Sequence, residues 1–329
     1  MDQNSQAEMT ESPQINRRAI PPAAVESQWQ AADGHPLRRI DWPGAQSPVR
    51  GSILFLPGRG DCYEKYLESL EQWHRAGWRV TASDWRGQAG SGRLGKDAVT
   101  GHIDDFDTWT DDLAHIWNQW VNEVPGPHVL AGHSMGGHLI MRALVDGKVQ
   151  PDAVFLSAPM LGMQGPPLPL PVLHLVAVLM TKIGDPTRQA WKWSEKPGEL
   201  PAHRANLLTH DPDRYFDEQW WRDTRPELVM GPASWKWVER AYASCRRLEQ
   251  PGALEAVGIP VLIVSTSGDK LVSHEANVRA AKRLPKGKLV TFGEEAHHEI
   301  LREVDDVRDR MMREIAIFLD GAVPQAPQG

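Results

Sequence analysis

The sequence of 329 residues has few cysteines, no long basic run and no long apolar run. Its two cysteines, Cys62 and Cys245, lie far apart without the spacing of metal ligands, which argues against a disulfide framework and a cysteine-based metal site. No block of lysine or arginine is longer than a pair, and the formal net charge is −7. Because nucleic-acid binding requires clustered positive charge, we expect no nucleic-acid partner.

A membrane span and a secretory signal are equally unexpected. The longest apolar stretch, 168–180, contains two prolines and a histidine and is shorter than the roughly 20 residues that a spanning helix needs. The first twenty residues are polar and lack the apolar core that follows the basic start of a signal peptide. We therefore expect a cytoplasmic protein, for which peripheral contact with the inner face of a membrane stays open.

Strand and helix patterns alternate along most of the chain, which predicts an α/β fold with a mainly parallel sheet flanked by helices. In such sheets the crossovers are right-handed, and ligands bind at the carboxyl ends of the strands. We expect strands at 49–56, 78–83, 128–131, 153–158, 260–265 and 288–292, and helices at 63–76, 106–121, 273–284, 304–319 and directly after the turn at 132–137.

One segment interrupts this alternation. Residues 159–232 are rich in proline and tryptophan and show helical fragments without a clear strand, which is typical of an inserted helical lid. The core is then expected to comprise residues 23–158 and 233–322. The polar tails, 1–22 and 323–329, are expected to be disordered or loosely attached.

The residues after the strand at 128–131 carry the pattern of a nucleophilic serine. A serine in a strand–turn–helix context sits on a strained turn that lifts its hydroxyl above the sheet edge. A Cβ two residues to either side would crowd that turn, so glycine is needed there. The pattern predicts that Ser134 is a nucleophile, although Gly-x-Ser-x-Gly also arises by chance in plain turns. The segment reads Gly132-His133-Ser134-Met135-Gly136-Gly137.

Candidates for the acid and the base follow in the chain order serine, acid, histidine. Asp269 comes directly after a strongly apolar strand, where it is either the acid of a triad or the cap of the next helix. The loop after the last strand holds two neighbouring histidines, His297 and His298, of which only one can point at the serine. Neither has a cysteine or a spaced histidine as a companion, so we expect no metal ion there.

These residue types suit acyl transfer. The histidine takes the proton of Ser134 as the serine attacks an ester carbonyl, then returns it to the leaving alcohol, while Asp269 fixes the imidazole tautomer. The developing oxyanion needs two backbone N–H donors. One is expected from Met135, the residue after the nucleophile, and the other from Arg59 in the loop after the strand at 49–56, unless that loop is an ordinary one.

Five motifs between about residues 50 and 320 are similar to those of a known enzyme superfamily. They are Leu56-Pro57-Gly58-Arg59, Asp84-Trp85-Arg86-Gly87-Gln88, the segment 132–137, Ser157-Ala158-Pro159-Met160 and Ala296-x-His298-Glu299-Ile300-Leu301. Together they resemble the α/β-hydrolase superfamily, and within it the monoglyceride lipase and lysophospholipase L2 branch, also called serine aminopeptidase S33-like hydrolases. In that branch glutamate and aliphatic residues commonly follow the catalytic histidine, which implies His298 as the base and leaves His297 as the alternative.

The resemblance implies an α/β-hydrolase fold with a lid and a cofactor-free serine carboxylic-ester hydrolase. Its substrate would be a monoacyl lipid, a lysophospholipid or a monoacylglycerol, cleaved through an acyl-enzyme on Ser134. The aliphatic stretch 168–180 suits an acyl chain, since each buried CH₂ gains about 0.8 kcal/mol, but packing of the lid explains it equally well.

A lid of this kind also allows transient contact with a membrane surface. Two alternatives stay open. One is an esterase or aminopeptidase-like hydrolase of small non-lipid acyl substrates, and the other is a catalytically silent α/β-hydrolase that binds a ligand.

Overall fold

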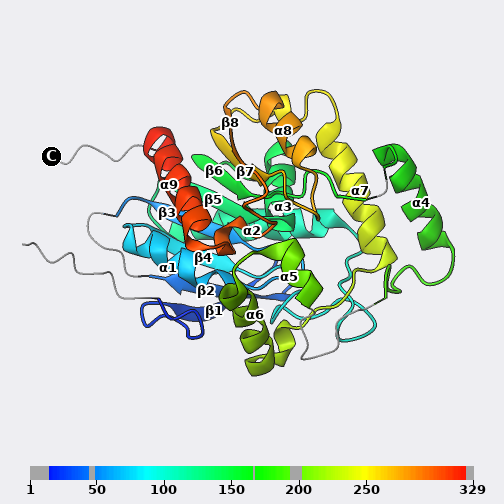
Figure 1. Cartoon of the computed structure of the whole chain (residues 1–329), viewed down its shortest axis with the longest axis horizontal. Coiled ribbons are helices and arrows are strands. Elements are labelled where there is room, and N and C mark those ends of the chain that lie inside the picture. Colours follow the sequence, from blue (N-terminus) through cyan, green and yellow to red (C-terminus); the bar gives the residue numbers. More distant parts are fainter. Residues whose placement is uncertain (1–14, 44–48, 166, 193–201, 324–329) are drawn as a thin grey trace, which may run out of the picture.

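The computed structural model describes residues 15–43, 49–165, 167–192 and 202–323 (Figure 1). Most of the two expected tails, 1–14 and 324–329, and part of the expected lid, 166 and 193–201, lie outside the described residues. Among the described residues, no helix combines the length and the apolarity that crossing a bilayer requires.

An eight-stranded sheet forms the centre of the molecule, in the order β1-β2-β4-β3-β5-β6-β7-β8. The strands from β3 to β8 run parallel, whereas β2 pairs antiparallel with both β1 and β4. Three central strands, β3, β6 and β7, are buried along their whole length, which explains their continuous apolar sequences. The strands are β1 Val25–Gln30, β2 Pro36–Trp42, β3 Ser52–Leu56, β4 Arg79–Ser83, β5 His128–His133, β6 Ala153–Ser157, β7 Val261–Thr266 and β8 Gly287–Phe292.

Amphipathic helices cover the sheet. In α2 the aromatic and aliphatic side chains of one stripe are buried, and Asp105 caps its first turn by accepting a hydrogen bond from the Asp107 N–H. Helix α9 lies in front of the sheet in Figure 1 and contacts β6 and β7, and α2 packs against α3. The core helices are α1 Leu67–Arg75, α2 Phe106–Glu123, α3 Met135–Val145, α8 His274–Arg283 and α9 Asp305–Ala322. The predicted α/β fold with a mainly parallel sheet is confirmed.

The segment between β6 and β7 forms a set of helices at the edge where the parallel strands end. Helix α4 (Leu170–Lys182) packs on α7 (Trp235–Glu249), and α5 (Ala202–Leu208) packs on α6 (Pro212–Thr224). Figure 1 shows α4 at one end of the molecule, with α5 and α6 on the other side of α7. Helix α7 lies in the range that the sequence assigns to the core, and it contacts both the core helix α3 and helix α4 of the inserted segment.

Two features at the N-terminal end differ from the sequence-based expectation. The sequence predicts no strand before residue 49, yet β1 and β2 extend the sheet. Four of the first five residues of β1 are exposed and polar side chains dominate it, so apolar alternation is weak there. Residues 15–22, which were expected in a loose tail, contact helix α6. Arg17 and Arg18 form salt bridges with Asp217 of α6, and the Arg17 carbonyl accepts a hydrogen bond from Trp221.

Candidate active site

Ser134 occupies the sharp turn between β5 and α3. Its backbone has φ 50° and ψ −117°, a conformation that residues with a Cβ rarely adopt. Three backbone hydrogen bonds hold the turn: the Ser134 N–H donates to the Ser157 carbonyl (3.0 Å), and the Ser134 carbonyl accepts from the N–H groups of His138 (3.1 Å) and Met160 (3.0 Å). The strained turn is therefore fixed at the carboxyl end of a central strand, where its hydroxyl faces the lid side.

The two glycines around Ser134 are required by close backbone contacts. A Cβ on Gly132 would lie 2.7 Å from the Gly137 nitrogen, and a Cβ on Gly136 would lie 2.2 Å from the Leu56 carbonyl oxygen. Real Cβ atoms do not approach backbone atoms that closely. The start of α3 and the end of β3 thus pack directly against the turn at Ser134. This agrees with the prediction that a Cβ two residues to either side of the serine would crowd the turn.

We expect Gly136→Ala to distort the turn at Ser134 severely. The new methyl group must push the elbow away from the end of β3, and such overpacking costs about 1–3 kcal/mol or more. Because a displacement of about 1 Å in a catalytic group lowers rates about 100-fold, we expect kcat to fall by about that factor. The measurements are ester hydrolysis and urea unfolding. Gly258→Ala is the matched control, since nothing lies within 4 Å of its new Cβ; equal behaviour of the two variants would contradict the contact.

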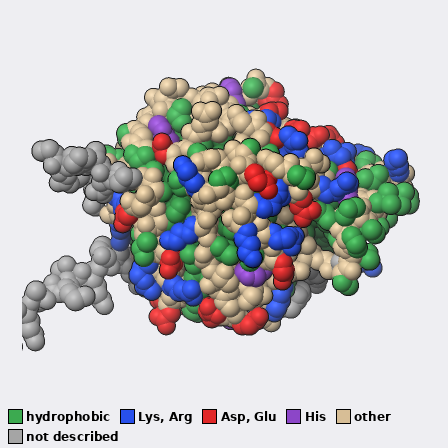
Figure 2. Space-filling model, turned by 90° about the horizontal axis from the view of Figure 1, so that it is seen from above, with side chains coloured by type: hydrophobic (Ala, Val, Ile, Leu, Met, Phe, Trp, Pro, Cys, Tyr) green, Lys and Arg blue, Asp and Glu red, His purple; other side chains and the backbone are tan. Residues whose placement is uncertain are grey.

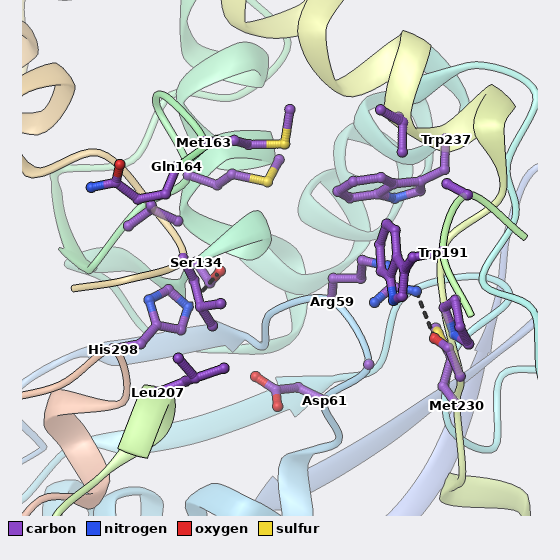
Figure 3. A pocket seen from close by; sticks show the side chains of 18 of the residues that line it. Arg59, Asp61, Ser134, Met163, Gln164, Trp191, Leu207, Met230, Trp237 and His298 are labelled. Atoms are coloured by element: carbon purple, nitrogen blue, oxygen red, sulfur yellow. Dashed lines mark hydrogen bonds between the residues drawn. The ribbon is translucent and has the colours of Figure 1, made fainter. Parts of the chain in front are cut away.

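The structure brings Ser134, His298 and Asp269 into one chain of contacts. His298 Nε2 lies 3.0 Å from Ser134 Oγ, and His298 Nδ1 lies 2.7 Å from Asp269 Oδ2. Asp269 Oδ1 accepts hydrogen bonds from the backbone N–H groups of Leu271 (2.8 Å) and Val272 (2.9 Å), which fix the carboxylate. Figure 3 shows His298 and Ser134 side by side at the cavity. A serine, an imidazole and a carboxylate in this order have the geometry of an activated nucleophile.

Burial and nearby charges set the protonation states of His298 and Asp269. Burial alone would raise the pKa of Asp269, but the charge of His298 and the hydrogen bonds from His298, Val272 and Leu271 outweigh it and lower that pKa. Burial opposes protonation of His298, but Asp269, Glu299 and Asp61 outweigh it and raise the pKa of His298 above its usual value. An ionised carboxylate thus supports an imidazole that is a stronger base than usual.

The second histidine of the loop, His297, points elsewhere. Its ring stacks on the ring of His210 at a centroid distance of 3.7 Å and an interplanar angle of 25°. Its backbone N–H donates to Glu303 Oε1 (2.7 Å). His210, His297 and Glu303 place potential metal-ligand atoms within 4.8 Å of one another, so in the folded chain His297 has a spaced histidine as a companion, which the sequence did not reveal.

His133, which precedes the serine, is a buried residue of the cavity wall. Its Nδ1 lies 3.2 Å from the Ser157 carbonyl oxygen, and its ring lies 4.7 Å from the ring of His298. Burial and the charge of His298 lower the pKa of His133 to about 4. The side chain is therefore neutral near neutral pH and adds no positive charge beside His298.

The expected oxyanion donors lie on two backbone segments that flank the serine. Met135 is the first residue of α3, whose initial N–H groups have no partner within the helix. The loop after β3 runs close by, since a Cβ on Gly58 would lie 3.1 Å from Ser134 Cβ. The side chain of Arg59 points away from Ser134 and donates to the Gly231 carbonyl (2.7 Å), which anchors the loop to the segment before α7 (Figure 3).

A cavity of about 660 Å³ adjoins Ser134 and His298. Figure 3 shows Met163 and Trp237 on one side of it and Asp61 and Leu207 on the other. The side built by α4, α7 and the segment after β6 is apolar, and the side near α5 and α6 combines Leu207 and Leu208 with charged residues. The apolar residues include Met160, Met163, Leu173, Val176, Ala177, Trp237 and Val238, and the charged ones are Arg59, Asp61, Arg204, Arg222 and Glu299.

Several residues of the site carry no sequence motif that singles them out. Arg204 of α5 and Arg222 of α6 reach the cavity from the segment between β6 and β7, and no local pattern in that segment singles them out. Asp61 and Lys65 lie four residues apart and form a salt bridge (2.5 Å), so their spacing was the one local signal available. Their burial beside the active site is evident only from the tertiary structure.

Comparison with known proteins agrees with this geometry. The family model described as serine aminopeptidase, S33 matches residues 47–305. Lysophospholipase L2 of Escherichia coli (strain K12) is 28% identical over 318 residues, covering 90% of this chain and 87% of that protein. The probable lysophospholipase L2 of Haemophilus influenzae is 26% identical over 279 residues, covering 84% and 85%.

Solved structures share the fold. A soluble variant of monoglyceride lipase from Saccharomyces cerevisiae, in complex with a substrate analogue, superposes with a TM-score of 0.73 at 18% identity, covering 95% of this chain and 98% of that one. The monoacylglycerol lipase of Paleococcus ferrophilus gives a TM-score of 0.63 at 21% identity, covering 91% and 99%.

Proposed function

We infer from the serine aminopeptidase S33 family, to which this chain belongs, and from the geometry around Ser134 that the chain hydrolyses the carboxylic ester of a monoacyl lipid. The observation that carries this proposal is the chain of contacts Ser134–His298–Asp269 beside a largely apolar cavity. The similarity to lysophospholipase L2 supports a lipid substrate.

The proposed reaction runs through an acyl-enzyme. His298 Nε2 takes the proton of Ser134 Oγ, which attacks the ester carbonyl, and Asp269 stabilises the imidazolium. The backbone N–H groups of Met135 and Arg59 would bind the oxyanion. The tetrahedral intermediate collapses as the ester C–O bond breaks, and His298 gives its proton to the leaving alcohol. A water molecule, deprotonated by His298, then attacks the acyl carbonyl and releases the fatty acid and free Ser134.

The two sides of the cavity suit the two parts of such a substrate. The apolar side offers a surface for an acyl chain, which gains about 0.8 kcal/mol for each buried CH₂. The charged side suits a polar head group. Its arginines Arg204 and Arg222 form salt bridges with Glu218, so the preference for a lysophospholipid among monoacyl lipids rests on the similarity to lysophospholipase L2.

An aminopeptidase-like reaction fits less well. It requires a carboxylate that binds the substrate ammonium group. The carboxylates at the cavity wall, Asp61 and Glu299, both form salt bridges with the buried ammonium of Lys65, at 2.5 and 2.6 Å. Their negative charge is thus already compensated by the protein.

We expect kcat/KM to rise with acyl length, by up to about fourfold per CH₂, until the apolar side of the cavity is filled. The measurement compares monoacylglycerols and lysophospholipids with acyl chains from acetyl to palmitoyl, with aminoacyl anilides as a further arm. Ser134→Ala, measured in parallel, corrects for non-enzymatic hydrolysis. A maximum at acetyl or propionyl esters would contradict the lipid proposal and favour a small-ester hydrolase.

We also propose that the lid touches the lipid surface from which the substrate enters. Helix α4 lines the cavity with Leu173 and Ala177, yet it exposes several large apolar side chains to solvent. In Figure 2 hydrophobic side chains gather at the end of the molecule where α4 lies. The exposed residues of α4 are Val172, Leu175, Val176 and Leu179, and Leu168 and Ile183 flank the helix. An apolar helix face of this kind can lie in a membrane interface.

The double variant Leu175→Glu/Leu179→Glu is expected to weaken binding to phospholipid vesicles at least tenfold, because two charges replace apolar contacts with the interface. Vesicle co-sedimentation measures the effect. Ile317→Glu on α9 is the matched control, since Ile317 is equally exposed on a core helix. Vesicle binding that is equal in the wild type and both variants would contradict contact through α4.

A further inference from the structure

A buried lysine connects three parts of the site. Lys65 lies in the short 3-10 helix η1 (Tyr63–Tyr66), and its side chain is 1% exposed. Its Nζ lies 2.5 Å from Asp61 Oδ1, 2.6 Å from Glu299 Oε1 and 3.1 Å from Glu218 Oε2. Three carboxylates from separate segments of the chain therefore share one ammonium group.

The first carboxylate holds the loop after β3 that carries Gly58 and the proposed oxyanion donor Arg59, called here the oxyanion loop. Asp61 Oδ2 accepts hydrogen bonds from the backbone N–H of Gly58 (3.2 Å) and from the Tyr66 hydroxyl (2.8 Å). Gly58 is the residue whose added Cβ would lie against Ser134, and it immediately precedes Arg59. The position of the Arg59 N–H relative to the serine thus depends on Asp61.

The second carboxylate holds the base. Glu299 directly follows His298 and also forms a salt bridge with Arg302. Its backbone N–H donates to the Leu208 carbonyl (2.8 Å) at the end of α5. The third carboxylate, Glu218, belongs to α6 of the lid and forms salt bridges with Arg204 and Arg222.

We propose that Lys65 is a positioning residue that ties the oxyanion loop, the His298 loop and lid helix α6 into one unit, and that its charge shields His298 from Asp61 and Glu299. This inference rests on the proposed function of Ser134 and His298. It assigns a role in the reaction to a lysine that touches neither the serine nor the histidine.

The charges around His298 and Lys65 predict the direction in which each substitution shifts the pKa of His298. His298 is faced by Asp269, Glu299, Asp61 and the neutral His133, while Lys65 is faced by the three carboxylates and Arg302. Burial disfavours the imidazolium, but Asp269, Glu299 and Asp61 together raise the pKa of His298. Removing the Lys65 charge would leave Asp61 without its cation and Glu299 with Arg302 alone, and would raise that pKa further. Removing the Glu299 charge would lower it.

The test compares Lys65→Met, Lys65→Arg and Glu299→Gln by their pH–rate profiles on one monoacyl ester. Since His298 acts as a base only when neutral, the acid limb of kcat/KM should move to higher pH in Lys65→Met and to lower pH in Glu299→Gln. In Lys65→Met we also expect kcat to fall about tenfold or more with KM within about threefold, because the oxyanion donors are misplaced. Lys65→Arg should restore the position of the acid limb.

Opposite shifts cannot come from a general loss of stability. Lys282→Met, an exposed lysine on α8, is the control and should leave the profile unchanged. If Lys65→Met does not fold, Asp61→Asn and Glu299→Gln still test the direction of the electrostatic effect on His298. Both variants remove a negative charge near His298, so both should move the acid limb of kcat/KM to lower pH. Acid limbs that stay in place, or that move in the same direction in Lys65→Met and Glu299→Gln, would overturn the inference. Activity that survives in Ser134→Ala would instead overturn the proposed function.

Discussion

Ser134→Ala is expected to lose about 10⁴- to 10⁶-fold in kcat while keeping its fold. The loss is this large because the variant has no atom that forms the acyl-enzyme, and only the oxyanion donors and substrate binding remain. The fold should persist because the structural role of Ser134 belongs to its backbone, whose N–H and carbonyl bond to Ser157 and Met160. Alanine keeps both groups.

Ester hydrolysis and urea unfolding together measure this prediction. Ser157→Ala is a matched control, because Ser157 lies at the end of the neighbouring strand β6 and, within the described part of the chain, its buried hydroxyl makes no hydrogen bond. We expect this control to keep its activity within about threefold. More than about 1% residual activity in Ser134→Ala would contradict the assignment of the nucleophile.

The two histidines of one loop should differ sharply when each is replaced by alanine. His298→Ala is expected to lose about 10⁴-fold or more, because no other imidazole lies within hydrogen-bond distance of Ser134 Oγ among the described residues. His297→Ala should stay within about tenfold of the wild type. Its ring contacts His210, and its link to Glu303 is a backbone N–H that alanine retains.

Steady-state kinetics on the same ester measures both variants, and circular dichroism checks their folds. The pair is internally matched because the two substitutions are chemically identical and adjacent in the chain. A greater loss in His297→Ala than in His298→Ala would reverse the assignment of the base.

Much of the fold was predictable because its signals are local. The buried strands β3, β6 and β7 are continuous apolar runs, and the elbow carries its glycines within five residues. The resemblance to the monoglyceride lipase and lysophospholipase L2 branch is confirmed by the family match and the curated relatives. The spacing alone left the choice between His297 and His298 open, and only the resemblance favoured His298.

The rest depended on long-range contacts. The carboxylates that share Lys65 lie at positions 61, 218 and 299, and no local pattern brings such distant residues together. The edge strand β1 was missed because its side chains are mostly polar and exposed. Residues 15–22 were expected in a loose tail, and their attachment to α6 through Asp217 is likewise a contact between distant parts of the chain.

The most direct measurement is covalent labelling with a fluorophosphonate, followed by mass spectrometry of the digested protein. The probe reacts with a serine hydroxyl that a neighbouring base has activated. We predict one adduct on Ser134 in the wild type, no adduct in Ser134→Ala and strongly slowed labelling in His298→Ala. An adduct on another residue, or labelling that persists in Ser134→Ala, would contradict the account of this site.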